Sequence, residues 1–216
     1  MILTYGDIII SDDETKTDGV SVLRIVKPAN ADTETTYQRR GFFLADRTVK
    51  TTISLAKCET DLDKFIRLPI VETTQYKEDI LKIAVESFVY DRRFHVLPDC
   101  STDISGMVLK QWVEELDTVF VALFKELPIG FLALKETSAD TLFVHLAAVS
   151  EKYRMTGAAM ALYANACKVA KQRGYKRLEG RISTQNTAVM NVYAAFGAVF
   201  SEPQDIFIKE VSHDVE

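Results

Sequence analysis

Apolar and polar residues follow two different periods along this chain, and the changes of period mark the predicted elements. Residues 143–149 are apolar and rich in branched side chains, which is typical of a buried strand. Apolar residues then recur at helical spacing between Gly157 and Gly174, which predicts an amphipathic helix. The turn between them exposes backbone N–H groups at the positive end of a helix dipole, a favourable place for phosphate. The sequence therefore predicts an anion-binding strand–loop–helix.

The same periods predict strands and helices on both sides of this unit. Before residue 64 we expect strands over 7–10, 20–26, 42–45 and 48–56 and a helix over 31–40. After it we expect strands over 66–71, 119–124, 130–134, 177–183 and 206–210, and helices over 76–88, 104–116 and 187–196. This order predicts an α/β fold with a mixed sheet, in which the long crossover helix joins two neighbouring strands. The polar run 61–64 is the predicted boundary between a small N-terminal α/β lobe (1–63) and a larger domain (64–216).

Composition narrows the class of protein. The 216 residues are 47% hydrophobic and 26% charged, which is ordinary for a soluble globular chain. A formal net charge of -5 does not favour a nucleic-acid partner. The sequence contains no apolar run near the roughly 20 residues that span a bilayer, so we expect no membrane partner. The start of the chain does not read as a signal peptide.

Cysteine and histidine spacing argues against metal and disulfide sites. Cys58, Cys100 and Cys167 are odd in number and widely spaced, which predicts a reducing, cytoplasmic location. His95, His145 and His213 are also far apart, so we expect no metal site. Cys167 lies in mid-helix without a partner base, so we interpret it as structural.

Several residues could carry chemistry. Arg154-x-x-Gly157-x-Ala159 is either a plain strand-to-helix turn or a phosphate loop, and the preceding strand and following helix favour the loop. Asn186 and Tyr193 are seven residues apart and therefore share one helix face. They could be an N-cap and a core tyrosine, or a ligand-binding amide and a proton donor suited to a leaving thiolate.

Two histidines also lie where they could carry chemistry. His145 lies in the buried strand, where a packed, hydrogen-bonded histidine is the ordinary case. Arg92, Arg93 and His95 cluster beside aromatic residues, and this cluster is either a surface feature or a grip on a substrate phosphate.

The loop and the residues that follow resemble the GNAT superfamily of N-acetyltransferases. The 154–159 loop is similar to that family's acetyl-CoA pyrophosphate loop, and the segments 184–188 and 193–198 look like its second cofactor motif. The resemblance covers 66–210 and departs at Ala159, where many members carry glycine. It implies an N-acetyltransferase with acetyl-CoA as co-substrate and no metal. The implied cofactor-binding residues are Leu146, Ala147, Ala148, Val149, Arg154, Met155, Thr156, Gly157, Ala158, Ala159 and Asn186.

A narrower resemblance concerns the acceptor. The segments 41–44, 49–53 and 93–95, with Trp112 and Asn186/Tyr193, look like the dTDP-fucosamine acetyltransferase type. This implies transfer to the 4-amino group of a dTDP-linked 4-amino-4,6-dideoxyhexose, a small-molecule acceptor. Arg93 and His95 would then bind the acceptor, and the N-terminal lobe would lie on the acceptor side.

The implied mechanism is direct transfer of the acetyl group. Backbone N–H groups of residues 146–149 would hold the acetyl carbonyl, and Tyr193 would protonate the thiolate. The base stays open between His145, His95 and a water chain. Alternatives are acetylation of a protein N-terminus or polyamine, and a catalytically silent acyl-CoA-binding module. The sequence also leaves open whether the protein is a homodimer.

Overall fold

The computed structural model describes residues 2–5, 8–15, 18–58, 61–88, 102–116 and 118–211. The strands are β1 (Ile2–Tyr5), β2 (Ile8–Ser11), β3 (Val22–Pro28), β4 (Phe43–Ser54), β5 (Ile70–Glu72), β6 (Thr118–Phe124), β7 (Leu127–Ser138), β8 (Thr141–Val149), β9 (Arg177–Ser183) and β10 (Val199–Glu210). The helices are α1 (Ala31–Arg39), α2 (Lys77–Ser87), α4 (Thr102–Glu114), α5 (Ala158–Gln172) and α6 (Thr187–Ala195), with 3-10 turns η1 (Asp63–Phe65) and η2 (Glu151–Thr156). All ten of these strands form one mixed sheet in the order β1-β2-β3-β10-β4-β9-β8-β7-β6-β5, which confirms the predicted α/β class.

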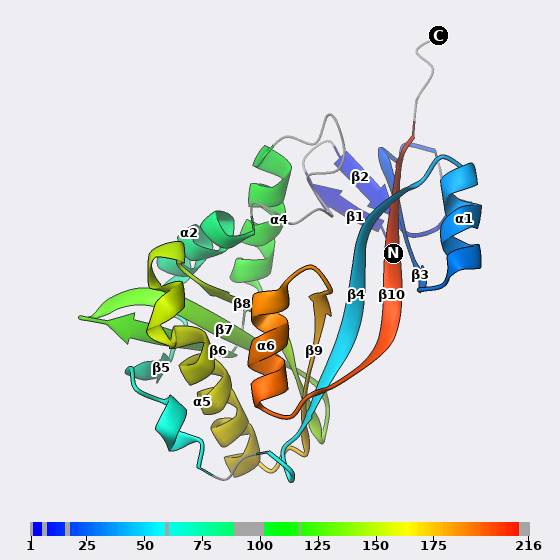
Figure 1. Cartoon of the computed structure of the whole chain (residues 1–216). Coiled ribbons are helices and arrows are strands. Elements are labelled where there is room, and N and C mark those ends of the chain that lie inside the picture. Colours follow the sequence, from blue (N-terminus) through cyan, green and yellow to red (C-terminus); the bar gives the residue numbers. More distant parts are fainter. Residues whose placement is uncertain are drawn as a thin grey trace.

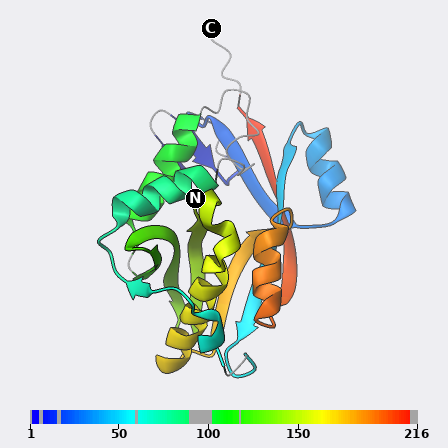
Figure 2. The same ribbon diagram turned by 60° about the vertical axis from the view of Figure 1, so that its left-hand side comes forward.

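Helices cover both faces of this sheet (Figures 1 and 2). Successive side chains of β7 point to opposite faces, as the period of a strand requires. Leu132 belongs to an apolar cluster with α5 and α6, whereas its neighbours Phe131 and Ala133 belong to a second cluster with α2 and α4. The central strands are therefore buried on both sides, which explains why their sequences read as nearly continuous apolar runs. Among the described helices, none is long and apolar enough to cross a membrane.

The N-terminal segment supplies one strand, β4, to the middle of the sheet, while its strands β1, β2 and β3 form one margin. Strand β4 lies between β9 and β10, and its residues 48–54 pair antiparallel with residues 183–177 of β9. Ile53, Leu55 and Leu62 are buried in the same cluster as α5 and α6. The sheet is thus not divided at residue 63, because long-range pairing joins the two predicted parts. That residues 1–63 serve the acceptor side stays a prediction.

Two local differences from the sequence-based elements have simple causes. The strands expected over 42–45 and 48–56 are one strand, β4, in which an extra residue between Leu44 and Asp46 shifts the register against β10. The strand expected over 66–71 is shorter and comprises only β5 (Ile70–Glu72), since Phe65 of η1 and the following Ile66 and Leu68 pack onto the α5 cluster.

Candidate active site

Strands β8 and β9 pair along only half of their length. Parallel pairing runs from Thr141↔Arg177 to Val144↔Gly180 and then ends. Beyond this point residues 146–149 of β8 pair with β7, and residues 181–183 of β9 pair with β4. We call this opening between the two strands the splay. Within the described residues, no strand pairs with the edge of β8 that faces it, so backbone groups there are available to a ligand.

A β-bulge lies where the splay begins. Ala133 of β7 faces Leu146, but the next residue, Leu134, faces Val144, so His145 is the extra residue in β8. Bulges of this kind redirect side chains and are frequent beside active sites. The His145 ring lies on the α4 side of the sheet, 6.0 Å between centroids from the Trp112 ring.

The surroundings of His145 favour its neutral form. Burial lowers the pKa of its imidazole below 6.5, and the positive charge of Lys135 acts in the same direction. Glu115, directly after α4, opposes this shift. A neutral imidazole at neutral pH can accept a proton. His95 and His213 lie outside the described residues.

Tyr193 reaches the apex of the splay from the opposite face of the sheet. The side chain is fully buried on α6 and meets Tyr163 of α5 edge-to-face, with 5.0 Å between ring centroids. Its hydroxyl lies directly over Gly180, where an added Cβ would come within 2.1 Å of the oxygen. Gly180 is also the last residue of β9 that pairs with β8. Only glycine admits this approach, so Gly180 sets the position of the phenol at the apex.

The Tyr193 phenol stays protonated. Burial raises its pKa to about 12, while the nearby hydroxyls of Thr51 and Tyr163 act in the other direction. Thr51, from β4, brings its buried hydroxyl close to the phenol but does not reach good hydrogen-bond geometry with any described residue. A neutral phenol in this position can donate a proton, as the sequence-based hypothesis requires.

The predicted phosphate loop lies at the open end of β8. After η2, Gly157 has φ 81°, a left-handed conformation that favours glycine, and α5 starts at Ala158. No side chain caps this helix, so its first N–H groups are available to an anion. Arg154 and Met155 are exposed, while Ala158 is buried and contributes only its backbone. Thr156 donates its hydroxyl to the Tyr153 carbonyl at 2.6 Å.

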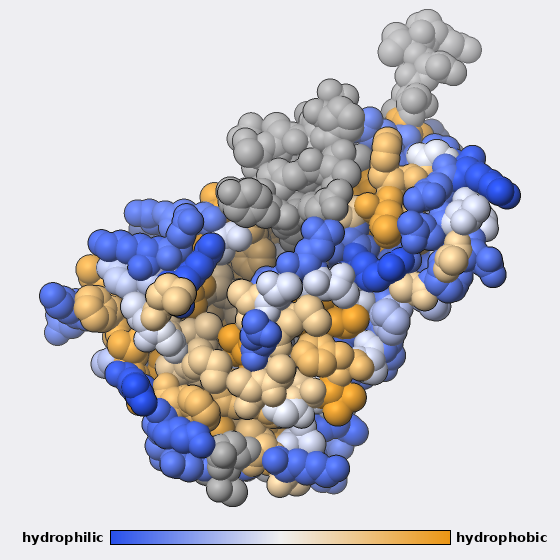
Figure 3. Space-filling model, viewed as in Figure 1, coloured by the Kyte–Doolittle hydropathy of each residue, from blue (hydrophilic) through white to orange (hydrophobic). Residues whose placement is uncertain are grey.

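Asn186 acts as the helix cap that its position predicts. Its Oδ1 accepts a hydrogen bond of 3.1 Å from the Val189 N–H, and the side chain is exposed at the start of α6. Figure 3 shows an apolar surface over α5 and α6. Three alanines of α6, Ala188, Ala194 and Ala195, are exposed. Such a surface is suited to the apolar parts of a ligand that follows these helices.

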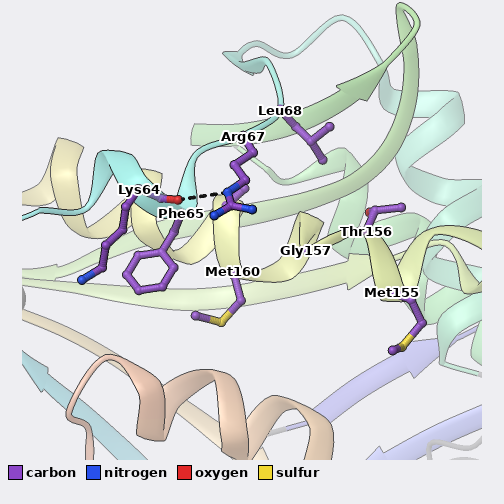
Figure 4. A pocket seen from close by; sticks show the side chains of 9 residues that line it. Lys64, Phe65, Arg67, Leu68, Met155, Thr156, Gly157 and Met160 are labelled. Atoms are coloured by element: carbon purple, nitrogen blue, oxygen red, sulfur yellow. Dashed lines mark hydrogen bonds between the residues drawn. The ribbon is translucent and has the colours of Figure 1, made fainter.

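A pocket of about 470 Å³ adjoins the loop (Figure 4). It is lined by Lys64, Phe65, Arg67, Leu68, Met155, Thr156, Gly157, Met160 and Ala161. Figure 4 shows Arg67 between Phe65 and Gly157. The sequence did not point to Lys64 or Arg67, because a charged residue near a predicted boundary ordinarily indicates only a solvated surface. Gly180 was also missed, although a glycine inside a predicted strand is a sign of close approach.

The structure thus brings together most of the predicted site. Residues 146–149 border the splay, the Tyr193 hydroxyl lies over Gly180 at its apex, and residues 154–159 follow at its open end. The predicted acceptor residues Arg93 and His95 fall outside the described residues. Cys167 is buried, and its hydrogen bond with Cys58 raises the pKa of its thiol, so it is no ready nucleophile. Within the described part of the chain, no three His, Cys, Asp or Glu side chains gather as metal ligands.

Comparison with solved structures shows the same fold in other proteins. A conserved protein of unknown function from Staphylococcus epidermidis superposes with a TM-score of 0.65 at 15% identity, over 89% of this chain and 73% of that one. A GCN5-related N-acetyltransferase from Sphaerobacter thermophilus gives 0.62 at 15% identity, and the match spans 90% of this chain but 61% of that protein. A fungal glucosamine N-acetyltransferase region of a GH3 β-N-acetylglucosaminidase gives 0.58 at 12% identity, over 88% of this chain and 26% of that one.

Sequence comparison identifies the family. No curated protein sequence matches the chain significantly. The model of the acetyltransferase (GNAT) family matches residues 78–198, which include both strands that border the splay and the loop at its open end. The narrower dTDP-fucosamine type stays a prediction. The chain belongs to the acetyltransferase (GNAT) family and is an N-acetyltransferase.

Proposed function

We propose that this enzyme binds acetyl-CoA in the splay and transfers the acetyl group directly to an amine that approaches from the α4 side. The observation that carries this proposal is the end of β8–β9 pairing at Val144 and Gly180. There the open edge of β8 runs from the Tyr193 hydroxyl at the apex to the Gly157 turn. A thioester with a phosphate-bearing tail needs backbone groups that hold its acyl part, a proton donor for its sulfur, and N–H groups for its phosphates. The open edge, the Tyr193 hydroxyl and the Gly157 turn supply these in that order.

Acetyl-CoA supplies the activated acetyl group, and the described residues fit it. We infer that the backbone N–H groups of residues 146–149 hold the acetyl carbonyl and stabilise it as it becomes an oxyanion. Residues 154–159 hold the pyrophosphate by backbone N–H groups, with the exposed Arg154 cation beside them. Asn186 positions the same molecule from the start of α6.

Proton transfer is assigned to two residues on opposite faces of the sheet. The amine nitrogen attacks the thioester carbon, so that a C–N bond forms and the C–S bond breaks. His145 accepts the amine proton, directly or through a water molecule, and Tyr193 donates a proton to the departing thiolate. The support is positional, since His145 contacts α4 and Tyr193 contacts α5, with the splay between them.

For the acceptor, we put first a nucleotide-linked amino sugar of the dTDP-4-amino-4,6-dideoxyhexose type. Its support is the sequence resemblance and the cations of Lys50 and Arg181, which face each other in the β4–β9 register. A structural neighbour named as a glucosamine N-acetyltransferase region adds support for an amino sugar. A cationic amine, such as a polyamine or a protein N-terminus, is the second candidate. It is favoured by Glu179 and Glu202, which lie 3.2 and 3.5 Å from Lys50.

Thiol release from acetyl-CoA with a panel of amines tests this proposal. We expect turnover with dTDP-4-amino-4,6-dideoxygalactose, weaker turnover with the unlinked amino sugar, and little with spermidine. The reverse order would support the cationic amine. A folded enzyme that binds acetyl-CoA but acetylates none of these amines would contradict the proposed acceptor classes.

We also propose that the enzyme works in the cytoplasm. Cysteine usage supports this, because Cys58 and Cys167 are buried thiols next to each other without a disulfide.

A further inference from the structure

One wall of the pocket is formed by Lys64, Phe65, Arg67 and Leu68, which belong to a segment (62–68) that precedes the part of the chain that matches the family. These residues are fixed in place at several points. Leu62 is buried, and the Phe65 ring lies 5.5 Å from the Phe196 ring at the end of α6. Asp63 forms a 2.6 Å ion pair with Lys168 of α5. The segment therefore bridges α5 and α6, and its side chains keep a defined position relative to the phosphate loop.

The charged side chains that line the pocket are all positive. Its two ionisable side chains, Lys64 and Arg67, are both cationic, and no carboxylate is among its lining residues. Arg67 donates from Nε to the Lys64 carbonyl at 3.3 Å, which orients the guanidinium. Among the described residues, no carboxylate is in ion-pair distance of Arg67. The other pocket residues are mostly apolar, so the lining suits a flat apolar group that carries negative charge.

We infer that this pocket holds the adenosine end of CoA and that Arg67, assisted by Lys64, binds its 3′-phosphate. This inference rests on the proposed function. CoA carries a pyrophosphate and a separate 3′-phosphate. The N–H groups at the start of α5 account for the pyrophosphate, which leaves the 3′-phosphate in need of a cation. Arg67 supplies one from the opposite wall, and a guanidinium matches the oxygens of a phosphate. Phe65, Met155 and Met160 offer apolar contact to the adenine.

The consequence is selectivity for CoA over 3′-dephospho-CoA, conferred by a segment outside the family match. Calorimetric binding of both compounds to the parent and to Arg67→Met forms a double-mutant cycle. We expect the parent to bind CoA about tenfold more tightly than 3′-dephospho-CoA, as one charge-assisted hydrogen-bonding contact provides. Arg67→Met should lose roughly that tenfold on CoA and almost nothing on 3′-dephospho-CoA. Arg67→Lys should keep part of the preference, and Lys64→Met should lose a smaller part.

Arg39→Met is the matched control, since Arg39 is an exposed arginine on α1, away from the pocket. It should leave both affinities unchanged. If Arg67→Met lost the same affinity for both compounds, or lost affinity for neither, the inference would be overturned while CoA binding in the splay stayed intact. A parent protein that binds neither compound would remove the proposed function as well. The unfolding temperature of each variant shows that the compared proteins are folded.

Discussion

The two halves of β8 have opposite surroundings although they belong to one strand. Residues 141–144 pair with β7 on one side and β9 on the other. Residues 146–149 pair with β7 only. Leu142 and Val144 in the closed half are buried, whereas Ala147, Ala148 and Val149 in the open half are half-buried. The closed half holds β7 and β9 in place by pairing with both, and the open half keeps backbone groups available to a substrate.

Three features maintain this difference. The bulge at His145 changes the course of β8 where pairing ends. The Tyr193 hydroxyl fills the space over Gly180 at the same level. Strand β4 pairs with β9 along residues 177–183 and so holds its far half away from β8. Each of these features can be removed separately, and the expected effects differ in size.

Removal of β4 should have the largest effect. A chain that begins at residue 64 lacks the partner of β9 and β10 and loses Ile53, Leu55 and Leu62 from the core. We expect no cooperative thermal transition by circular dichroism and no acetyl-CoA binding. A chain that begins at residue 18 is the control, because it loses only β1 and β2 at the sheet margin and should still fold. Cooperative melting and acetyl-CoA binding of the shorter chain would make β4 dispensable.

Loss of the apex phenol should slow turnover without unfolding the protein. Tyr193→Phe keeps the buried ring, and we expect kcat to fall about 10²–10⁴-fold, or about 3–5 kcal/mol in the barrier. Because the phenol has a pKa of about 12, it should not cause a loss of rate at moderately alkaline pH. A thioester with a better leaving thiol should restore much of the rate. Tyr37→Phe, which removes a buried phenol on α1 away from the splay, is the control. A Tyr193→Phe rate within a few-fold of the parent, with chemistry rate-limiting, would make Tyr193 a core residue only.

His145, the extra residue of the bulge, should determine how kcat/KM depends on pH in the acidic range. If His145 is the base, kcat/KM rises as its imidazole loses a proton, with a midpoint below 6.5 because burial and Lys135 lower its pKa. His145→Gln should remove this limb and cost about 10²-fold or more at neutral pH. Lys135→Met should move the midpoint upward and Glu115→Gln downward, since these are the charges that act on His145. An unchanged limb in His145→Gln would assign the proton to another group.

The glycine under the phenol should affect stability more modestly. Gly180→Ala places a Cβ 2.1 Å from the Tyr193 oxygen, and we expect a loss of roughly 1–3 kcal/mol in the free energy of unfolding by urea. Combination with Tyr193→Phe removes the oxygen and should recover part of the loss. Gly106→Ala is the control, because it lies within α4 with open space around its Cβ and should stabilise by about 0.5–1 kcal/mol. Additive losses in the double variant would argue against the close approach.

Local features of this chain could be predicted from its sequence, and long-range ones could not. The α5 helix, the Gly157 turn and the Asn186 cap depend on neighbouring residues, and the structure has them as expected. The insertion of β4 between β9 and β10 depends on pairing across more than a hundred residues. The Gly180–Tyr193 contact and the place of Arg67 in the pocket depend on tertiary packing, since no local pattern brings those residues together. The site was therefore predicted along α5 and α6 but not across the sheet.

Amide hydrogen exchange along β8 tests the central claim most directly, because it separates the two halves of the strand. Acetyl-CoA at saturating concentration should slow exchange in residues 146–149 and at the start of α5. Residues 141–144, already paired on both sides, should change little. Protection confined to the open half is the result that binding in the splay predicts. Saturable acetyl-CoA binding with no slowing of exchange in residues 146–149 would contradict it.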